Sequence, residues 1–350
     1  PFPPRSPYSD AAIAHWPNAY FLRHSVWTYG QWPLWNPQRM LGQPFAANPL
    51  SKVWYPPQWL VLILPPTVHL HVLIVLHLAW LALGMAAWAR AERLHPLAGT
   101  FAALAWGLNP KLIGHLGAGH LDMVYALAWT PWLLWAARRL RDAPSLERGA
   151  WLGVVGALLT LADLRVAFYM LPVGAVYGLV SPQATVTPEK GRGWRPWLMA
   201  LASLVLLTAV QTIPLAALSP YLTRSLITAQ EAAVFSLPPR YLAGLLFANA
   251  GGLQEWMTHL GLPVLGLALI AHRRQSGVIM WWIVAALALL WALGSNGPIF
   301  LFMVERLPLA GWFRVPSRAW FVVALSLIIL SAYGLDRLCL LYTSPSPRDS

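Results

Sequence analysis

Charged residues are scarce in this chain of 350 residues, where they make up 10% of the sequence against 58% hydrophobic residues. Ordinary soluble domains carry roughly 25% charged residues, so this composition excludes a soluble globular domain as the main body of the protein. The mean hydropathy is +0.54. Apolar runs of about 20 residues, the length that crosses a bilayer core about 30 Å thick, recur along most of the chain. The composition therefore predicts an all-α, polytopic transmembrane helical bundle.

Acidic residues and cysteine are scarcer still. The chain has 12 Asp and Glu against 24 Lys and Arg, which gives a formal charge of +12. The basic residues stand singly or in short clusters between apolar runs, so membrane topology explains them and nucleic acid is not an expected partner. The single cysteine, Cys339, excludes an intramolecular disulfide and any metal cluster built from cysteines.

Both ends of the sequence differ from those of a whole membrane protein. Residue 1 is Pro, with no initiator Met and no signal peptide, so we expect the natural start to lie upstream. The last stretch, residues 339–350 (CLLYTSPSPRDS), departs from the membrane pattern and resembles a translated adapter sequence. We therefore leave it out of the predicted fold.

Window length and flanking charge predict about nine spans. They cover residues 67–89, 96–114, 121–137, 149–163, 166–180, 196–218, 258–271, 277–294 and 319–336. The fourth and fifth spans come from one apolar stretch that contains Asp163 and Arg165. A single straight helix there would hold both charges at the centre of the bilayer, where they are costly, so we predict a hairpin that turns at residues 163–165.

Short loops with Lys and Arg mark the cytoplasmic side of a membrane protein. With the hairpin in place, every short loop on one side is basic, and residues 1–66, 219–257 and 295–318 form long segments on the other side. We expect these long segments to be external and to carry the chemistry. The remaining chain, residues 67–338, forms the transmembrane domain.

The first external segment, residues 1–66, is too polar to span a bilayer. After Ser9 and Asp10, which suit a helix start, apolar or aromatic residues recur at three- and four-residue spacing. These are Ile13, Trp16, Tyr20, His24 and Trp27. The pattern predicts an amphipathic helix that lies on the bilayer surface.

Several motifs carry a resemblance to a known family. The first segment reads YGQWPLWNP at residues 29–37, preceded by Ser9-Asp10 and Trp16-Pro17 and followed by Gly42-Gln43-Pro44 and Tyr55-Pro56-Pro57. Weaker matches are Gly119-His120-Leu121, Trp129-Thr130-Pro131, residues 235–239 (FSLPP) and residues 313–318 (FRVPSR). Over residues 8 to about 338 the chain resembles the YfhO-like bacterial membrane proteins, which are similar to the GT-C class of polytopic glycosyltransferases.

This resemblance implies a transmembrane helix before residue 1, further chain after the last span, and a sugar donor linked to polyprenyl phosphate. It also implies a catalytic carboxylate in the first external loop, and Asp10 occupies the matching position. Such a carboxylate takes the proton of the acceptor hydroxyl. The residues alone leave a second interpretation open, in which Asp10 only favours the N-terminus of the helix that follows it.

A lipid-phosphate leaving group calls for cations at the external face. Arg314 and Arg318 are spaced i, i+4 at the start of the last span, and guanidinium groups suit bidentate phosphate recognition. The alternative is that both simply extend to the membrane surface at a helix end. Arg224 and Arg240 are weaker candidates of the same kind.

Other polar residues are candidates for substrate binding. His115, His120 and Asp122 lie together between the second and third spans. They suit a divalent metal or a phosphate, but polar packing against the first loop accounts for them as well, and we expect no resident cofactor. Glu231, Glu255 and His259 are candidates to line the same external cavity. Trp35 and Asn36, with Trp32 and Trp54, are candidates to contact a sugar.

Two other functions stay open. A lipid or glycan transporter driven by protons would favour ionisable residues inside the spans, and nearly all of them fall in loops here. A non-catalytic assembly protein would give the external charged residues no chemical role.

Overall fold

The computed structural model describes residues 9–39, 41–180, 193–222, 227–248, 253–271, 277–307 and 312–343. These ranges are mainly helical. Their strands are β1 (Trp35–Asn36) and β2 (Gln43–Pro44), which pair antiparallel with Trp35 opposite Pro44. The all-α prediction is therefore confirmed for the described part of the chain.

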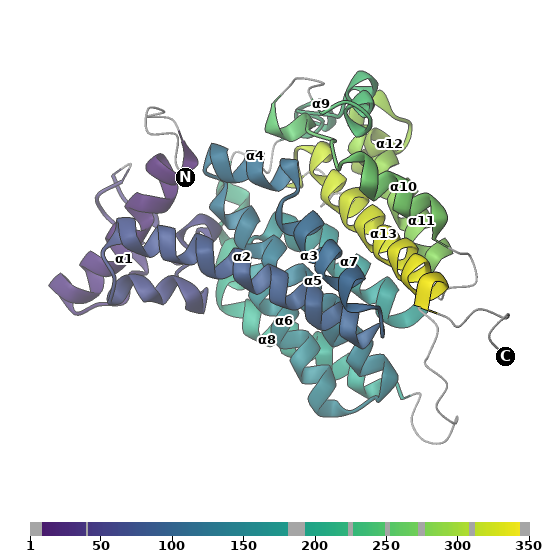
Figure 1. Cartoon of the computed structure of the whole chain (residues 1–350). Coiled ribbons are helices and arrows are strands. Elements are labelled where there is room, and N and C mark those ends of the chain that lie inside the picture. The colour runs from purple at the N-terminus through teal and green to yellow at the C-terminus, as the bar shows by residue number, and fades with distance from the viewer. Residues whose placement is uncertain are drawn as a thin grey trace, which may run out of the picture.

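The helices follow one another along the chain (Figure 1). The longer ones are α1 (Trp16–Tyr29), α2 (Pro66–Ala91), α3 (Pro96–Gly107), α4 (Pro110–Ala118), α5 (Leu121–Asp142), α6 (Leu146–Ala162), α7 (Leu164–Val180), α8 (Arg195–Leu218), α10 (Leu262–Ile270), α11 (Val278–Ala292), α12 (Ile299–Arg306) and α13 (Trp320–Thr343). Shorter turns include the π-helix η1 (Ala11–His15), the 3₁₀-helices η3 (Pro56–Leu62), η7 (Gln254–Trp256) and η10 (Pro316–Ala319), and α9 (Ala229–Ala232).

Among the described residues, three helical stretches are long and apolar enough to cross a membrane: Pro66–Ala91, Arg195–Tyr221 and Pro316–Leu341. The helices α7 and α11 are apolar but shorter. A multi-pass membrane protein is thus supported, whereas the predicted count of nine spans is not confirmed. One predicted span, residues 96–114, is divided into α3 and α4 at Leu108 and Asn109, where Pro110 follows and its missing N–H breaks the helix.

The predicted break between the fourth and fifth spans is present. Asp163 has extended backbone angles, φ −157° and ψ 112°, and separates α6 from α7. The two helices fold back and pack against each other. The Leu171 side chain on α7 lies 3.2 Å from the position that a Cβ on Gly156 of α6 would take. The two charges therefore lie at the turn and not in the middle of a helix.

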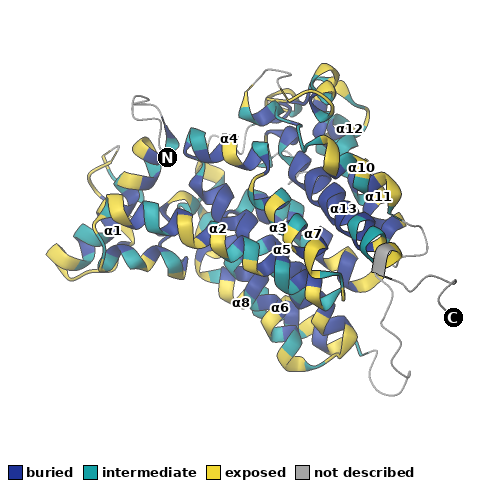
Figure 2. Ribbon diagram, in the orientation of Figure 1, coloured by how far each residue is buried: buried dark blue, intermediate teal, exposed yellow. Residues whose placement is uncertain are grey.

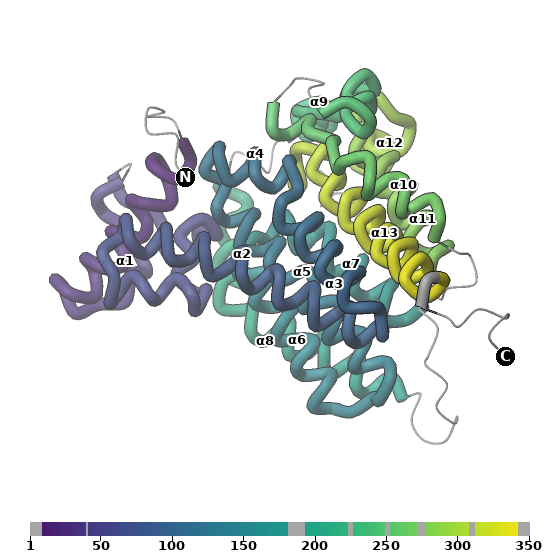
Figure 3. The backbone as a smooth tube through the Cα atoms, in the orientation of Figure 1, coloured from purple at the N-terminus to yellow at the C-terminus, as the bar shows by residue number. Residues whose placement is uncertain are grey.

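Burial separates α13, which is mostly buried, from peripheral helices such as α8 (Figure 2), and the path of each helix can be followed in Figure 3. In the most apolar window of the stretch that contains α13, 94% of the residues are buried, against 17% for the stretch that contains α8. The helix α13 packs against α3, α10 and α11, and α8 packs against α6. An apolar helix that packs on few neighbours needs another apolar environment, so the exposed side of α8 suits lipid contact. The helix α13 also runs through Thr343, past residue 339, where we expected the membrane pattern to end.

The predicted helix in the first segment is also present, as η1 followed by α1. The rings of Trp16, Tyr20 and His24 stack along it at centroid distances of 5.5 Å. The guanidinium of Arg23 donates hydrogen bonds to the carbonyl oxygens of residues 61, 62 and 64, which fixes α1 against the end of η3. Trp16, Tyr20 and Trp27 are exposed, and the position of this helix on a bilayer surface stays a prediction.

The helices α5, α7 and α13 share a direction that determines where the polar groups gather. Asp122, Arg165 and Arg318 lie at or just before the first turns of these helices. At the other ends, Glu92 accepts hydrogen bonds from Arg138, Tyr177 and Tyr333. The charged groups of these helices thus lie at the two ends of the bundle, and the first segment packs over the end that holds Asp122.

Candidate functional site

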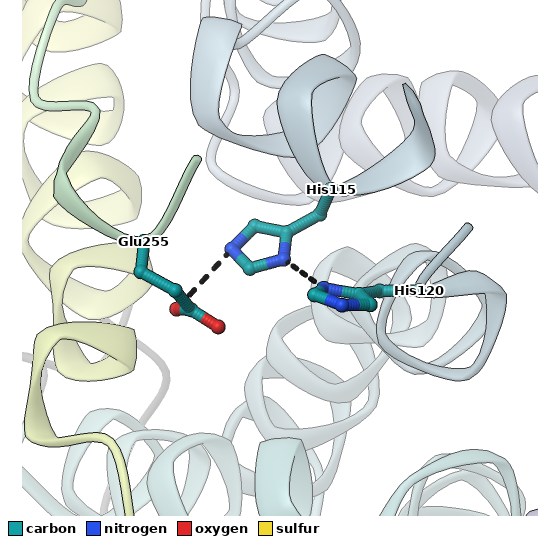
Figure 4. Close-up of side chains that lie close together, drawn as sticks. All are labelled: His115, His120 and Glu255. Atoms are coloured by element: carbon teal, nitrogen blue, oxygen red, sulfur yellow. Dashed lines mark hydrogen bonds and ion pairs between the residues drawn. The ribbon is translucent and has the colours of Figure 1, made fainter. Parts of the chain in front are cut away.

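A continuous line of charged and imidazole groups runs from the first segment to the start of α13. The carboxylate of Asp10 lies 3.4 Å from His120 Nε2, and His120 Nδ1 lies 2.6 Å from His115 Nδ1. His115 Nε2 is 3.5 Å from Glu255 Oε2, and Glu255 Oε1 accepts hydrogen bonds from Arg318 Nη2 at 2.6 Å and Nε at 3.1 Å. Figure 4 shows His115 between Glu255 and His120. We call these five residues the histidine line.

Local backbone features place the two histidines. Asn109 begins α4 by accepting a hydrogen bond from the Lys111 N–H, and Gly119 ends it at φ +84°, so His115 and His120 lie on either side of a tight turn. A Cβ on Gly119 would lie 2.3 Å from Ser9 Oγ. A glycine is therefore needed at this position both for the backbone angle and for the close approach of the first segment, which brings Asp10 to His120.

The other end of the histidine line depends on a strained turn. Val315, directly before η10, has φ +67°, which is unfavourable for a β-branched residue. Its N–H donates to the carbonyl of Ala232 at 3.2 Å, which helps to hold this conformation. Strained residues of this kind concentrate at functional sites. The turn directs Arg318 to Glu255, whose backbone carbonyl in turn accepts a hydrogen bond from the buried Lys111 ammonium group.

Burial and neighbouring charges control protonation along the line. Burial, with Lys111 and Arg318 nearby, holds the pKa of His115 well below its usual value despite the opposing effect of Glu255. Burial and Arg318 lower the pKa of His120 as well. Burial alone would raise the pKa of Glu255, but Arg318, His115 and Lys111 lower it to about 2. At neutral pH the carboxylate is therefore ionised and both imidazoles are neutral.

A second line of polar groups runs beside the first. Lys52 Nζ lies 2.9 Å from His15 Nδ1, and His15 Nε2 lies 3.6 Å from Asp122 Oδ1. Arg165 Nη2 donates to Asp122 and, at 2.7 Å, to Asp163. Burial and the Lys52 ammonium group lower the pKa of His15 to about 3, so this imidazole is neutral at pH 7. We call this set the aspartate line.

A cavity of about 420 Å³ lies against the aspartate line. Its polar side contains Asp122, Asp163 and Arg165 and the amides of Gln43 and Asn48. Its apolar side is formed by residues at and after the end of α8 and by two aromatic residues, namely Leu215, Leu218, Leu222, Trp312 and Phe313. Such a cavity suits a ligand with a polar head and an apolar tail.

The two lines approach each other inside the bundle. A small void of about 10 Å³ between α5, α7 and α13 is lined by both Arg165 and Arg318. Arg318 is nearly buried and its guanidinium contacts Glu255, whereas Arg165 lines the larger cavity. Arg165 Nη1 makes no hydrogen bond within the described ranges, so this nitrogen is available to a ligand.

The structure brings together some of the residues that the sequence suggested. Asp10, His120, Glu255 and Arg318 join in the histidine line, and Asp122 belongs to the aspartate line. The contacts of Asp10 with His120 and of His15 with Asp122 are the polar packing against the first loop that we expected.

Other candidates lie elsewhere. Arg314 is exposed. Glu231 forms the capping box of α9 with Thr228, and these hydrogen bonds, with a smaller effect of Arg314, lower the pKa of Glu231. The ring of Trp35 is 55% exposed. Asn36 is buried and accepts a hydrogen bond from the N–H of Gln38.

The remaining candidates make local contacts or are not described. Arg240 packs over Tyr241, and His259 lies 2.9 Å from the Gly244 carbonyl. Trp32 packs against Trp54. Arg224 lies outside the described residues.

His15 and Lys52 were not among the residues that the sequence suggested, and Asp163 and Arg165 were predicted only to lie at the hairpin turn. The sequence did contain a signal for Lys52, which is the one lysine in an apolar stretch rich in Trp and Pro. A lysine that is buried among such residues needs a polar partner, so a partner could have been expected. The histidine stood among the aromatic residues of a helix, where its polar partners were not recognisable.

Comparison with known proteins gives a likeness of fold. No protein-family model and no curated protein match this chain. Among solved structures, the arabinofuranosyltransferase AftD from Mycobacteria is similar with a TM-score of 0.53 and 16% sequence identity. The match covers 93% of this chain and 23% of that protein, so the chain spans less than a quarter of its neighbour. The likeness shows the fold alone, a helical membrane fold that this chain shares with part of AftD.

Proposed function

We propose that this chain is part of a membrane glycosyltransferase that transfers a sugar from a polyprenyl-phosphate donor to a cell-envelope acceptor. The reaction would take place at the outer face of a bacterial inner membrane, with residues 1–66 on that side and with all nine predicted spans in the bilayer. The observation that carries the proposal is the cavity of about 420 Å³, which joins charged groups to the leucine side chains of α8. The GT-C-like fold supports the same class of reaction.

The catalytic base in this proposal is Asp10. Asp122 and Asp163 both accept hydrogen bonds from Arg165, and Glu255 accepts them from Arg318, so these three carboxylates are engaged. The side chain of Asp10 is 48% exposed and has the neutral His120 as its neighbour. An accessible carboxylate is what a hydroxyl acceptor needs as its proton leaves and its oxygen attacks the anomeric carbon. The alternative structural role weakens, because the side chain of Asp10 makes no capping hydrogen bond to the helix that follows.

The donor phosphate would be held by Arg165 rather than by Arg318. Arg165 lines the cavity and has one guanidinium nitrogen free within the described ranges. The first turns of α5 and α7 carry partial positive charge, which favours an anion at the same end of the bundle. Arg318 would keep Glu255 ionised and in position, and Arg314 would contact the lipid surface. The sugar would lie among the carboxylates and amides at the polar side of the cavity. Trp35 and Asn36 would act from β1, which pairs with the Gln43 and Pro44 that line the cavity.

A transfer assay tests this proposal. The full-length protein is reconstituted in liposomes with radiolabelled polyprenyl-phosphate arabinofuranose or polyprenyl-phosphate glucose, and label that leaves the lipid for a glycan acceptor is measured. Asp10→Asn is expected to lower transfer by about 100-fold or more, the usual contribution of a general base. Arg165→Lys is expected to weaken donor binding, because one ammonium group cannot replace the guanidinium fork.

Glu147→Gln is the matched control, since this exposed carboxylate lies at the start of α6, far from Asp10 in the sequence. Its transfer rate should equal that of the unchanged protein. Undiminished transfer by Asp10→Asn would remove Asp10 from the mechanism. Movement of labelled lipid across the bilayer with no transfer of sugar would support a transporter and overturn the enzyme proposal.

A further inference from the structure

The two imidazoles of the histidine line have fewer N–H groups than the contacts that they make. His115 and His120 present their Nδ1 atoms to each other at 2.6 Å. The Nε2 atom of each ring points to a carboxylate, Glu255 at 3.5 Å for His115 and Asp10 at 3.4 Å for His120. An ionised carboxylate only accepts hydrogen bonds, and a neutral imidazole has one N–H. Three contacts therefore share two protons.

The most favourable placement of the two protons leaves a conflict. If both Nε2 atoms carry hydrogen, each donates to its carboxylate, and two bare Nδ1 lone pairs face each other at 2.6 Å. If one proton moves to Nδ1, the bare Nε2 of that ring faces a carboxylate. His115 Nε2 and Glu255 Oε2 are in fact buried without a hydrogen-bond partner in the described part of the chain. The arrangement therefore lacks a positively charged species, either a proton or a metal cation.

A third proton is a poor solution at neutral pH. The ammonium group of Lys111 and the guanidinium of Arg318 already contact Glu255, and a further buried imidazolium without a new partner would be costly. A metal cation between the two Nδ1 lone pairs removes the conflict without an added proton. Each imidazole would then donate its other N–H to a carboxylate, which is the usual outer shell of a metal-bound histidine.

We propose that His115 and His120 bind a divalent transition-metal ion, with Glu255 and Asp10 as the carboxylates that orient the two rings. One ligand atom from each of His115, His120 and Glu255 lies within 4.8 Å of the others, so Glu255 also offsets the charge of the ion (Figure 4). Imidazole ligands favour zinc and similar ions over magnesium or calcium. This inference concerns metal binding alone and does not depend on the proposed glycosyl transfer.

The geometry requires only a small adjustment. Tetrahedral zinc with Zn–N bonds of about 2.0–2.1 Å places its ligand atoms about 3.3 Å apart. The two Nδ1 atoms, now at 2.6 Å, would therefore separate by less than about 1 Å. Two coordination positions would be left for water or for an oxygen atom of a ligand. Lys111 and Arg318 add positive charge nearby, so we expect an affinity in the micromolar range.

Metal titration of the full-length protein tests the proposal. The protein is purified in detergent and treated with a chelator. Zinc, magnesium and calcium are then titrated separately, with calorimetry to follow binding and elemental analysis to count the ions after desalting. One zinc ion per chain is expected, with magnesium and calcium at least 10-fold weaker. Cobalt substitution should give the visible absorption of a nitrogen-ligated ion.

Variants separate this site from adventitious binding. His120→Gln should weaken zinc by more than 10-fold, and Asp10→Asn by about 10-fold, as the loss of an outer-shell partner does. His120 is only partly buried, so its replacement should leave the melting temperature nearly unchanged. His24→Gln is the control, because that histidine contacts Thr28 on α1 and lies outside the line. The proposal is overturned by the absence of zinc binding, or by equal zinc affinity in His120→Gln and the unchanged protein.

Discussion

The turn between α6 and α7 depends on Asp163, and replacing it by Ala should destabilise the protein strongly. The carboxylate is 2% exposed and accepts the Arg165 N–H at 2.7 Å, Arg165 Nε at 3.0 Å and Nη2 at 2.7 Å. Loss of the contact to the first N–H groups of α7 costs about 1 kcal/mol. Loss of hydrogen bonds to a charged partner costs about 1.5–3 kcal/mol. Since Asp122 still pairs with Arg165, we expect a total of about 3 kcal/mol for Asp163→Ala.

The measurement is reversible unfolding of the full-length protein in mixed micelles of mild detergent and dodecyl sulfate. Glu147→Gln is again the control, because an exposed side chain outside such networks should change the free energy of unfolding by about 0.5 kcal/mol or less. A loss below about 1 kcal/mol for Asp163→Ala would refute the reasoning. It would mean that the helical hairpin is maintained by packing alone and that the hydrogen bonds of Asp163 add little.

Three further predictions concern packing, pH and the cavity. Gly153→Ala should lower the free energy of unfolding by about 1–3 kcal/mol, because the new Cβ would lie 2.3 Å from the Ala200 carbonyl oxygen on α8. Gly266→Ala is the control, because its new Cβ would meet no atom within 4 Å and the change should be neutral or stabilising. The folded pKa of His15, about 3, lies below its ordinary 6.5, so its contribution to stability is complete above pH 6.5 and falls towards pH 3, with a slope of up to about 1.4 kcal/mol per pH unit. His15→Gln should flatten the acid limb of stability against pH, and an unchanged limb would contradict this assignment. Leu218→Trp should fill part of the cavity and lower sugar transfer at least tenfold at an unchanged melting temperature, while the exposed Leu146→Trp should transfer normally.

Much of the helical framework was predictable from the sequence. The position of the α6–α7 break followed from the cost of holding Asp163 and Arg165 in a bilayer, which is a property of the residues themselves. The first helix followed from the local spacing of its apolar residues and the helix-starting residues before it. The prediction of one span over residues 96–114 was wrong, because the structure divides it into α3 and α4. The local signal for the break was Asn109-Pro110, but the apolar residues around it had favoured a continuous helix.

The candidate site was predictable only as a set of residues. That His120 and Asp122 pack against the first loop was expected, but the partners of Arg318 and Lys52 were not. Glu255 and Arg318 are separated by 63 residues, and Lys52 and His15 by 37.

The sequence by itself determined that this chain is a helical membrane protein and where most of its helices begin and end, because apolar length, charge cost and helix termini act locally. The tertiary structure decided which buried charges face each other, that Arg165 rather than Arg318 lines the cavity, and that His115 and His120 meet through their Nδ1 atoms. These outcomes depend on how α5, α7 and α13 pack together at one end, and the packing of distant segments is not encoded in any local pattern.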